Sequence, residues 1–276
     1  MEILNSIYDI FGLIYEPTFM RRSALAMALL CLSTSSAGVM VVNRRLAFFP
    51  DAVGHSVFAG VALALLFGFN LQLTVLGLSV LIGLTITFLA RHSHLASDTI
   101  IGLVFSGAVA LGLALVSREP QATSGLSRFF LGDVLTVDDG QILALAGLAL
   151  LSFVFLFFLT NRLTLSCLVP KTKKNTWTDY LFGAYLALVV AISVQAVGVL
   201  LVTALLIAPA ATGRVLSVSL RGMFWLALCS GLLAGQLGLW ASSLPAINAA
   251  AGASVVLTNV LLFGLASLFR SLGPLR

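Results

Sequence analysis

Charged side chains are scarce in this chain of 276 residues. Asp, Glu, Lys and Arg make up 9% of it, against 60% hydrophobic residues. A soluble domain carries roughly a quarter charged residues, so a water-soluble globule is excluded. The mean hydropathy of +1.11 agrees with that exclusion. A soluble nucleic-acid binder is excluded with it, although the net charge is +5.

Several sequence motifs are also absent. The three cysteines, Cys31, Cys167 and Cys229, lie far apart and form no CxxC pair, which argues against a disulfide framework or a zinc module. The first lysine is Lys171 and no GxxxxGK[ST] run occurs, so the chain has no Walker A phosphate cradle. If ATP drives it, another subunit must hydrolyse the ATP. No GxSxG or HExxH supports a membrane hydrolase.

Long apolar stretches fill the chain instead, and a membrane-spanning helix needs about 20 such residues. They predict an all-α, polytopic membrane helix bundle that forms one domain over residues 1–276, with no second soluble domain. The expected spans are 23–42, 52–69, 71–90, 99–117, 141–160, 180–197, 198–213, 222–240 and 254–270. Residues 180–207 are continuously apolar, so the count is eight or nine. Residues 1–17 have acidic residues and no basic region, which predicts an amphipathic interfacial helix rather than a signal peptide.

The positions of the basic residues predict the orientation, because Lys and Arg concentrate in cytoplasmic loops. With nine spans, eleven of the fifteen fall on one side and four on the other. The N-terminus is then outside, the C-terminus is cytoplasmic, and the acidic loop 118–140 is outside. The larger set comprises Arg44, Arg45, Arg91, Arg162, Lys171, Lys173, Lys174, Arg214, Arg221, Arg270 and Arg276, and the smaller set Arg21, Arg22, Arg118 and Arg128.

Small residues recur inside two spans. Ser33, Ser35, Ser36, Ala37 and Gly38 cluster in the first, and Gly231, Gly235 and Gly238 form a GxxxGxxG run in the eighth. Lipid provides no hydrophobic drive for helix association. Helix faces made of small residues allow close packing instead, so these two runs are predicted to have a structural role.

Polar groups within a span are costly and are therefore functional candidates. Asp51 and His55, in FFPDAVGHSVFAG, are four residues apart and share one helical face. A carboxylate and an imidazole suit Mn²⁺, Fe²⁺ or Zn²⁺. The alternative is structural: Asp51 is the N-cap of its span after Pro50, and His55 hydrogen-bonds within the bundle.

Other polar residues favour structural explanations. His92 and His94 fit a solvated loop, and Asp98 fits the N-cap of the fourth span. The basic cluster of Lys171, Lys173 and Lys174 fits contact with anionic headgroups.

Four stretches, in order, resemble one family over nearly the whole chain. They are VVNRRLAFFPDAVGHSVFAGVALA, SDTIIGLVFSGAVALGLALVS, FFLGDVLTV and VGVLLVTALLIAPAATGRVL. The family is that of the permease subunits of bacterial ABC-type importers of manganese, zinc and iron (ABC-3). Departures are Pro50 and Gly54 where the family has Gly and Ser, Phe58-Ala59 where a Pro is common, and the unusual segment 166–179.

This resemblance implies a fold similar to that of the vitamin-B12-type importer permeases. The implied partners are a second permease chain (the same or related), cytoplasmic ATP-binding subunits, an extracytoplasmic metal-binding protein and the bilayer. It implies that Asp51 and His55 bind the transported metal, and that no cofactor is held permanently. Residues 209–219 would contain a short docking helix opened by Pro209, with Ala210, Ala211 and Arg214 coupling the permease to the ATPase.

The leading hypothesis is thus a non-enzymatic permease subunit of an ATP-driven importer of Mn, Zn or Fe, in the bacterial cytoplasmic membrane. The alternative is a secondary transporter in which Asp51 and His55 relay protons or bind a coupling ion. A non-transporting membrane scaffold is a third class. The sequence does not choose the metal.

Overall fold

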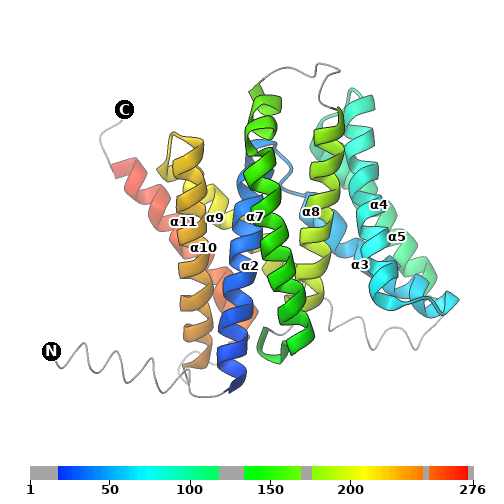
Figure 1. The fold of residues 1–276 in the computed structure, drawn as a ribbon, viewed down its shortest axis with the longest axis horizontal. Coiled ribbons are helices and arrows are strands. Elements are labelled where there is room, and N and C mark those ends of the chain that lie inside the picture. The colour runs from blue at the N-terminus through cyan, green and yellow to red at the C-terminus, as the bar shows by residue number, and fades with distance from the viewer. Residues whose placement is uncertain (1–17, 118–133, 169–175, 245–248, 273–276) are drawn as a thin grey trace.

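A computed structural model describes residues 18–117, 134–168, 176–244 and 249–272. All the long elements within these ranges are α-helices (Figure 1). They are α2 (Thr18–Asn43), α3 (Phe49–Phe67), α4 (Leu71–His92), α5 (Ser97–Val116), α7 (Asp139–Leu168), α8 (Thr176–Val197), α9 (Val199–Leu216), α10 (Leu220–Ser243) and α11 (Ala251–Leu272), with a short 3-10 turn, η2 (Val134–Thr136), before α7.

In the described ranges, nine helices are long and apolar enough to span a membrane, which confirms the predicted all-α bundle. The open choice between eight and nine spans is decided at Gly198, which separates α8 from α9. Its backbone has φ 86° and ψ 162°, a region that is essentially restricted to glycine. A continuous helix cannot pass through that conformation, so the apolar stretch 180–207 is two helices.

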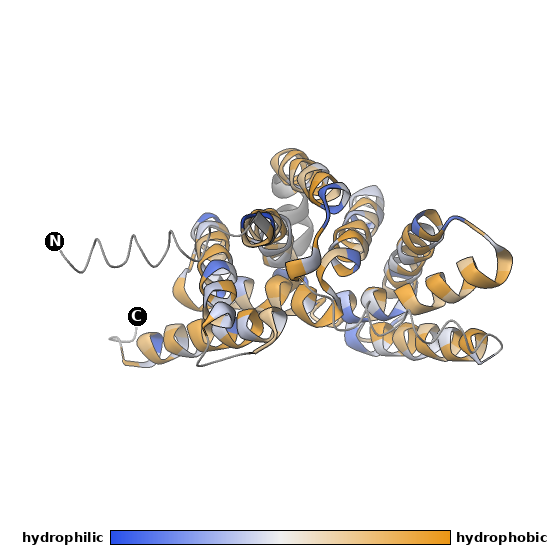
Figure 2. Ribbon diagram, turned by 90° about the horizontal axis from the view of Figure 1, so that it is seen from below, coloured by the Kyte–Doolittle hydropathy of each residue, from blue (hydrophilic) through white to orange (hydrophobic). Residues whose placement is uncertain are grey.

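The helices form two groups on either side of a central pair, α2 and α7 (Figure 1). One group is α9, α10 and α11, which pack on one another, and α2 packs against α9 and α10. The other is α3, α4 and α5, with α8 between α4 and α7. Apolar residues dominate nearly every helix in the view from below (Figure 2), as expected for elements that meet lipid.

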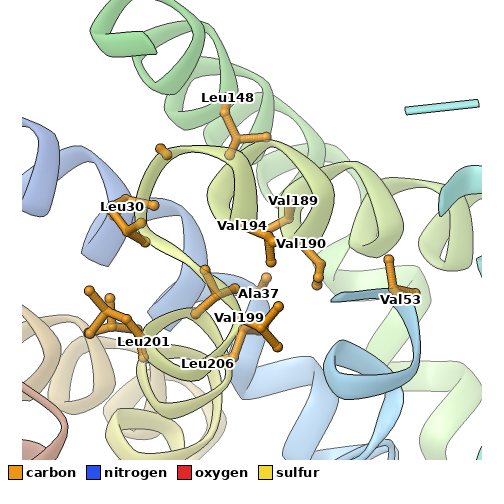
Figure 3. Packing of buried hydrophobic residues seen from close by; sticks show 14 of the residues in the cluster. Leu30, Ala37, Val53, Leu148, Val189, Val190, Val194, Val199, Leu201 and Leu206 are labelled. Atoms are coloured by element: carbon orange, nitrogen blue, oxygen red, sulfur yellow. The ribbon is translucent and has the colours of Figure 1, made fainter. Parts of the chain in front are cut away.

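The core lies where α2, α7, α8 and α9 converge near the break at Gly198. Figure 3 shows aliphatic side chains from these helices and from α3 pointing toward one another. Val190, Val202 and Leu206 are fully buried there. The members labelled in the figure are Leu30, Ala37, Val53, Leu148, Val189, Val190, Val194, Val199, Leu201 and Leu206.

Small residues are what let the helices come this close. A Cβ added at Gly38 would lie 1.9 Å from the carbonyl oxygen of Leu206 on α9. On α10, a Cβ at Gly231 would lie 2.1 Å from Ser35 Oγ, and one at Gly238 would lie 2.4 Å from the Cα of Val255 on α11. The predicted structural role of the small-residue runs in the first and eighth spans is therefore confirmed.

Two details at helix ends differ from or extend the sequence predictions. Asp98 does not cap α5: the N-cap residue is Ala96, and Asp98 lies within the first turn, where its charge favours the positive end of the helix dipole. His92 ends α4 with its ring stacked on Phe88, and both His92 and His94 are exposed, in line with a solvated turn.

The predicted interfacial helix 1–17, the lysine cluster and most of the loop 118–140 lie outside the described residues.

We expect Gly38→Ala to lower the stability of the purified permease in detergent, because the added methyl group collides with backbone rather than with a movable side chain. Overpacking of this kind costs about 1–3 kcal/mol. The matched control is Gly107→Ala on α5, where an added Cβ meets nothing within 4 Å. Thermal unfolding of both variants measures the difference. An equal fall in the unfolding temperature of the two variants would show that the contact at Gly38 is not what stabilises the bundle.

Candidate metal site

The candidate site begins where α3 begins. Its N-cap residue is Phe48, which makes no side-chain capping bond, and Pro50 occupies the first turn. Proline is favoured there because its missing N–H has no partner within the helix in any case. Asp51 therefore lies inside the first turn of α3 and is not its N-cap, which removes one of the two structural explanations for this carboxylate.

Asp51 and His55 are both half-buried on α3. The imidazole Nδ1 lies 2.9 Å from the backbone oxygen of Asp51, an atom that can only accept. Nδ1 must therefore carry the proton that it donates, and in the neutral ring Nε2 then keeps its lone pair. Metal-binding histidines are usually held in this way, with the second ring nitrogen donating to a carbonyl or carboxylate. The expected intrabundle hydrogen bond of His55 is thus present and is compatible with metal binding.

Neighbouring helices fix the surroundings of this pair. The ring of Phe105 on α5 meets the His55 ring edge-on, with the centroids 5.0 Å apart. Between the two candidate ligands, Gly54 faces the start of α9, where an added Cβ would lie 3.0 Å from Val199 Cγ1. The pair therefore sits between α5 and the break that begins α9. The contact of Phe105 with His55 could not be predicted from the sequence, because only the packing of α5 on α3 brings the two rings together.

An ionic cluster secures the segment that leads into α3. Arg44 Nη1 lies 2.9 Å from Oδ1 of Asp179 on α8, and Arg91 of α4 donates to the other carboxylate oxygen. The guanidinium of Arg44 also lies 4.8 Å from the centroid of the Phe182 ring. One carboxylate thus ties two arginines from separate segments, all at low exposure. Sequence reasoning missed this cluster because its members are 88 and 135 residues apart.

The described part of one chain offers an incomplete ligand set. Within the described residues, no group of three or more His, Cys, Asp or Glu side chains is close enough together to hold an ion. A dehydrated Zn²⁺ ion is coordinated by four ligands, and Mn²⁺ is coordinated by up to six. Asp51 and His55 supply two side chains, so further ligands must come from backbone, water, residues outside the described ranges or another chain.

The predicted coupling residues all belong to α9, but not in the expected arrangement. Pro209 does not open a short helix: it lies inside α9, which continues to Leu216, and the connection to α10 is only three residues long. Neighbouring helices cover Pro209 and Ala210, which are buried, and Ala211 is half-buried. Proline is tolerated within membrane helices when the surrounding helices support it. Arg214 is exposed, and its Nη1 donates to Asn43 Oδ1 over 2.7 Å.

Comparison with known proteins gives the chain its family. Residues 16–270 match the model of the ABC 3 transport family. The chain belongs to this family. It is 31% identical to the manganese import system permease protein ScaB of Streptococcus gordonii, over 89% of each chain. It is 27% identical to a "probable iron transport system membrane protein" of Haemophilus influenzae, over 93% of this chain and 96% of that one.

A solved structure has a similar fold. The structure of PsaBC from Streptococcus pneumoniae in complex with Fab matches with a TM-score of 0.78 and 26% identity, covering 94% of this chain and 95% of that chain. Family, relatives and fold therefore agree that this is a multi-pass membrane protein of the ABC 3 transport family, as the sequence motifs predicted.

Replacing Asp179 by Asn should destabilise the permease by about 3 kcal/mol, because it leaves two arginines of low exposure without their shared counter-charge. The matched control is Asp139→Asn, whose partner Arg22 and own side chain are mostly exposed, and which should change little. Chemical denaturation of both variants in detergent measures the difference. An Asp179→Asn variant as stable as wild type would show that the cluster does not hold the entry to α3.

Proposed function

We propose that this protein is the membrane permease of an ATP-driven importer of a divalent transition metal, and that Asp51 and His55 bind the ion on its way across. The observation that carries the proposal is the Asp51–His55 pair itself. A carboxylate and a correctly oriented imidazole lie one helical turn apart inside a span, where polar groups are rarely kept without a function. Relatives named for manganese and iron transport favour Mn²⁺ or Fe²⁺ over Zn²⁺.

The incomplete ligand set supports a site shared between two permease chains. A two-fold axis repeats any residue that lies near it, so two copies of Asp51 and His55 would give four protein ligands. Four such ligands form a tetrahedron for Zn²⁺, and bidentate carboxylates extend the set to six for Mn²⁺. The proposed stoichiometry is therefore one pathway metal per permease dimer. The partner chain is either identical to this one or closely related to it.

The position of α9 supports a route for coupling to ATP hydrolysis. Its first residue, Val199, packs against Gly54 between the two candidate ligands, and Arg214 is exposed near its other end. The two residues are separated by about 22 Å of helix, at 1.5 Å per residue. A displacement of the exposed end by cytoplasmic ATP-binding subunits would reach the metal ligands through a single rigid element. In this proposal Pro209, Ala210 and Ala211 lie within helix α9, which transmits the displacement. Arg214 lies at the contact with the ATP-binding subunits.

The charge distribution supports an orientation with the C-terminus in the cytoplasm of a bacterial cell. Arg44, Arg45, Arg91, Arg214, Arg221 and Arg270 lie at the ends of helices on one side, whereas Arg21 and Arg22 lie at the start of α2 on the other. The extracytoplasmic binding protein would deliver its metal to that second side. A secondary transporter remains the alternative function, and it would need no ATPase.

Asp51→Ala and His55→Ala should each abolish metal uptake in proteoliposomes that contain the cognate ATPase and binding protein, because either change removes half of the ligands. Asp98→Ala and His92→Ala are matched controls that remove exposed residues of the same types, and they should transport normally. Uptake without the ATPase would favour the secondary transporter instead. Full uptake by a variant that lacks both Asp51 and His55 would overturn the metal site.

A titration of the purified wild-type dimer with Mn²⁺, in the absence of the binding protein, tests the shared site. We expect one ion per dimer, and no ion at this site after either alanine substitution. Two equivalent ions per dimer would mean that each chain completes its own site.

The orientation is open to thiol labelling. In a background without the three native cysteines, Gly140→Cys at the start of α7 should react with an impermeant reagent added to whole cells. His94→Cys, in the turn after α4, should react only after the membrane is opened. Both positions are exposed in the bundle, so the reverse pattern would invert the topology.

The coupling route predicts that Arg214→Glu leaves the permease folded but reduces its assembly with the ATPase, because the contact charge is reversed. Co-purification with the ATPase and metal-stimulated ATP hydrolysis are the measurements. If both survive the substitution, the exposed end of α9 is not the contact.

A further inference from the structure

One side of α3 is open, and it carries the candidate ligands toward the outside of the chain. Asp51 and His55 are only half-buried, so each keeps exposed surface. A carboxylate and an imidazole within a span are costly to leave against lipid. Something other than lipid must therefore cover this side of α3, and the proposed shared metal site makes a second copy of this chain the occupant.

Two helices flank the open side of α3 at the same depth. On one flank, the ring of Phe105 on α5 lies 5.0 Å from the His55 ring, centroid to centroid. On the other flank, Val199 at the start of α9 packs against Gly54, the residue before His55. An ion bound by His55 would lie within about 10 Å of both helices, roughly one helix diameter. A second copy that shares the ion must therefore approach α5 and α9 as well.

Two-fold symmetry then decides which helices meet. A two-fold axis through the shared ion, perpendicular to the membrane, keeps every residue at its depth and turns each flank onto the opposite flank of the other copy. The α5 helix of one copy therefore faces the start of α9 in the other copy. Ser106 and Leu200, which follow Phe105 and Val199 in the chain, lie at that depth. Both are exposed, Leu200 to 67%.

The exposed surface of α5 suits a close neighbour better than it suits lipid. This helix packs on α3 and α4 at the edge of the bundle (Figure 1). An added Cβ at Gly102 meets no atom of the described chain within 4 Å, whereas the space beside Gly38 inside the bundle is filled by α9. Small faces let membrane helices approach closely, and those of α5 recur every four residues. The exposed small residues are Gly102, Ser106, Ala110 and Ala114.

We propose that a second copy of this chain docks on the face formed by α3 between α5 and the start of α9. The small residues of α5 in one copy pack against the start of α9, around Leu200, in the other copy. The inference rests on the proposed shared metal site and adds the surface that brings the two halves of that site together. The copies then associate through small residues, as the helices within each copy do.

Disulfide crosslinking in membranes from cells that express the whole importer tests this arrangement. In a background without the three native cysteines, Leu200→Cys is combined in turn with one of three substitutions on α5: Gly102→Cys, Ser106→Cys or Ala110→Cys. These positions cover about 12 Å of α5, at 1.5 Å per residue. Oxidation should link at least one pair into a covalent dimer that a reducing agent separates, because a disulfide needs Cα atoms within about 7 Å. The matched control, Leu200→Cys with Leu81→Cys on α4, should stay monomeric; Leu81 is 59% exposed.

A pair of glycine variants measures the contribution of the small face. Gly102→Leu on α5 and Gly147→Leu on α7 each add a side chain where a Cβ would meet nothing within 4 Å in the described chain, so both should fold. Gly102→Leu should raise the dissociation constant of the purified dimer in detergent about tenfold or more, because the new side chain overpacks the contact. Gly147→Leu should leave that constant unchanged.

Three results would overturn the arrangement. The first is as much covalent dimer from Ser106→Cys alone as from its pair with Leu200→Cys, because α5 would then face its own copy. The second is no more covalent dimer from any of the three pairs than from the Leu81→Cys control. The third is an equal dissociation constant for the two leucine variants.

Metal uptake separates this inference from the proposed function. Crosslinking of the pairs, together with uptake that survives the loss of Asp51 and His55, would keep the docking surface and remove the metal site. Uptake that depends on Asp51 and His55, without crosslinking of any pair, would keep the metal site and remove the docking surface.

Discussion

Contact between helix backbones at small residues is the constraint on which the rest of this structure depends. Inside a bilayer, burial of apolar surface does not drive one helix onto another, because lipid tails are equally apolar. Association has to come from close van der Waals packing. Here α2 provides it: Gly38 meets the backbone of α9, and Ser35 fills the space left by Gly231 of α10. Because α2 also packs on α7 and α8, this one helix joins the two halves of the bundle.

The candidate metal site follows from that framework. The middle of α9 packs against α2, where Gly38 meets Leu206, and the first residue of α9, Val199, packs against Gly54 of α3. The entry to α3 is tied down by Arg44, whose carboxylate partner Asp179 also holds Arg91. The two candidate ligands are therefore carried on an element that is supported at its first turn. A rigid support of this kind is what a binding site needs if helix displacement is to change its geometry.

The two ionic arrangements at the basic side of the bundle differ in a way that bears on their roles. At Asp179, a carboxylate compensates the arginines within the fold, and the result is a structural tie. At Arg214 and Arg270, the hydrogen-bond acceptors are neutral, so positive charge remains on two exposed side chains at the end of α9. The first arrangement stabilises the interior of the protein, and the second leaves charge at the surface where the contact with the ATP-binding subunits is proposed.

The sequence by itself determined those features that depend on local chemistry. A span is recognised from about 20 consecutive residues, so the helices could be predicted. The four-residue spacing of Asp51 and His55 puts them on one face of any helix that contains them. The motifs that identify the family are also read directly from consecutive residues.

Only the tertiary structure decided features that depend on distant partners or on backbone torsion. The apolar composition around Gly198 suits one helix or two, and its positive φ made the break. Pro209 is as acceptable at a helix start as inside a membrane helix, and the helices packed around it decided for the interior. The ties of Asp179 to Arg44 and Arg91, and the hydrogen bond of Arg270 to Val215 beside Arg214, join residues that share no sequence pattern. Such pairings are fixed by how whole helices pack, which no local stretch of sequence encodes.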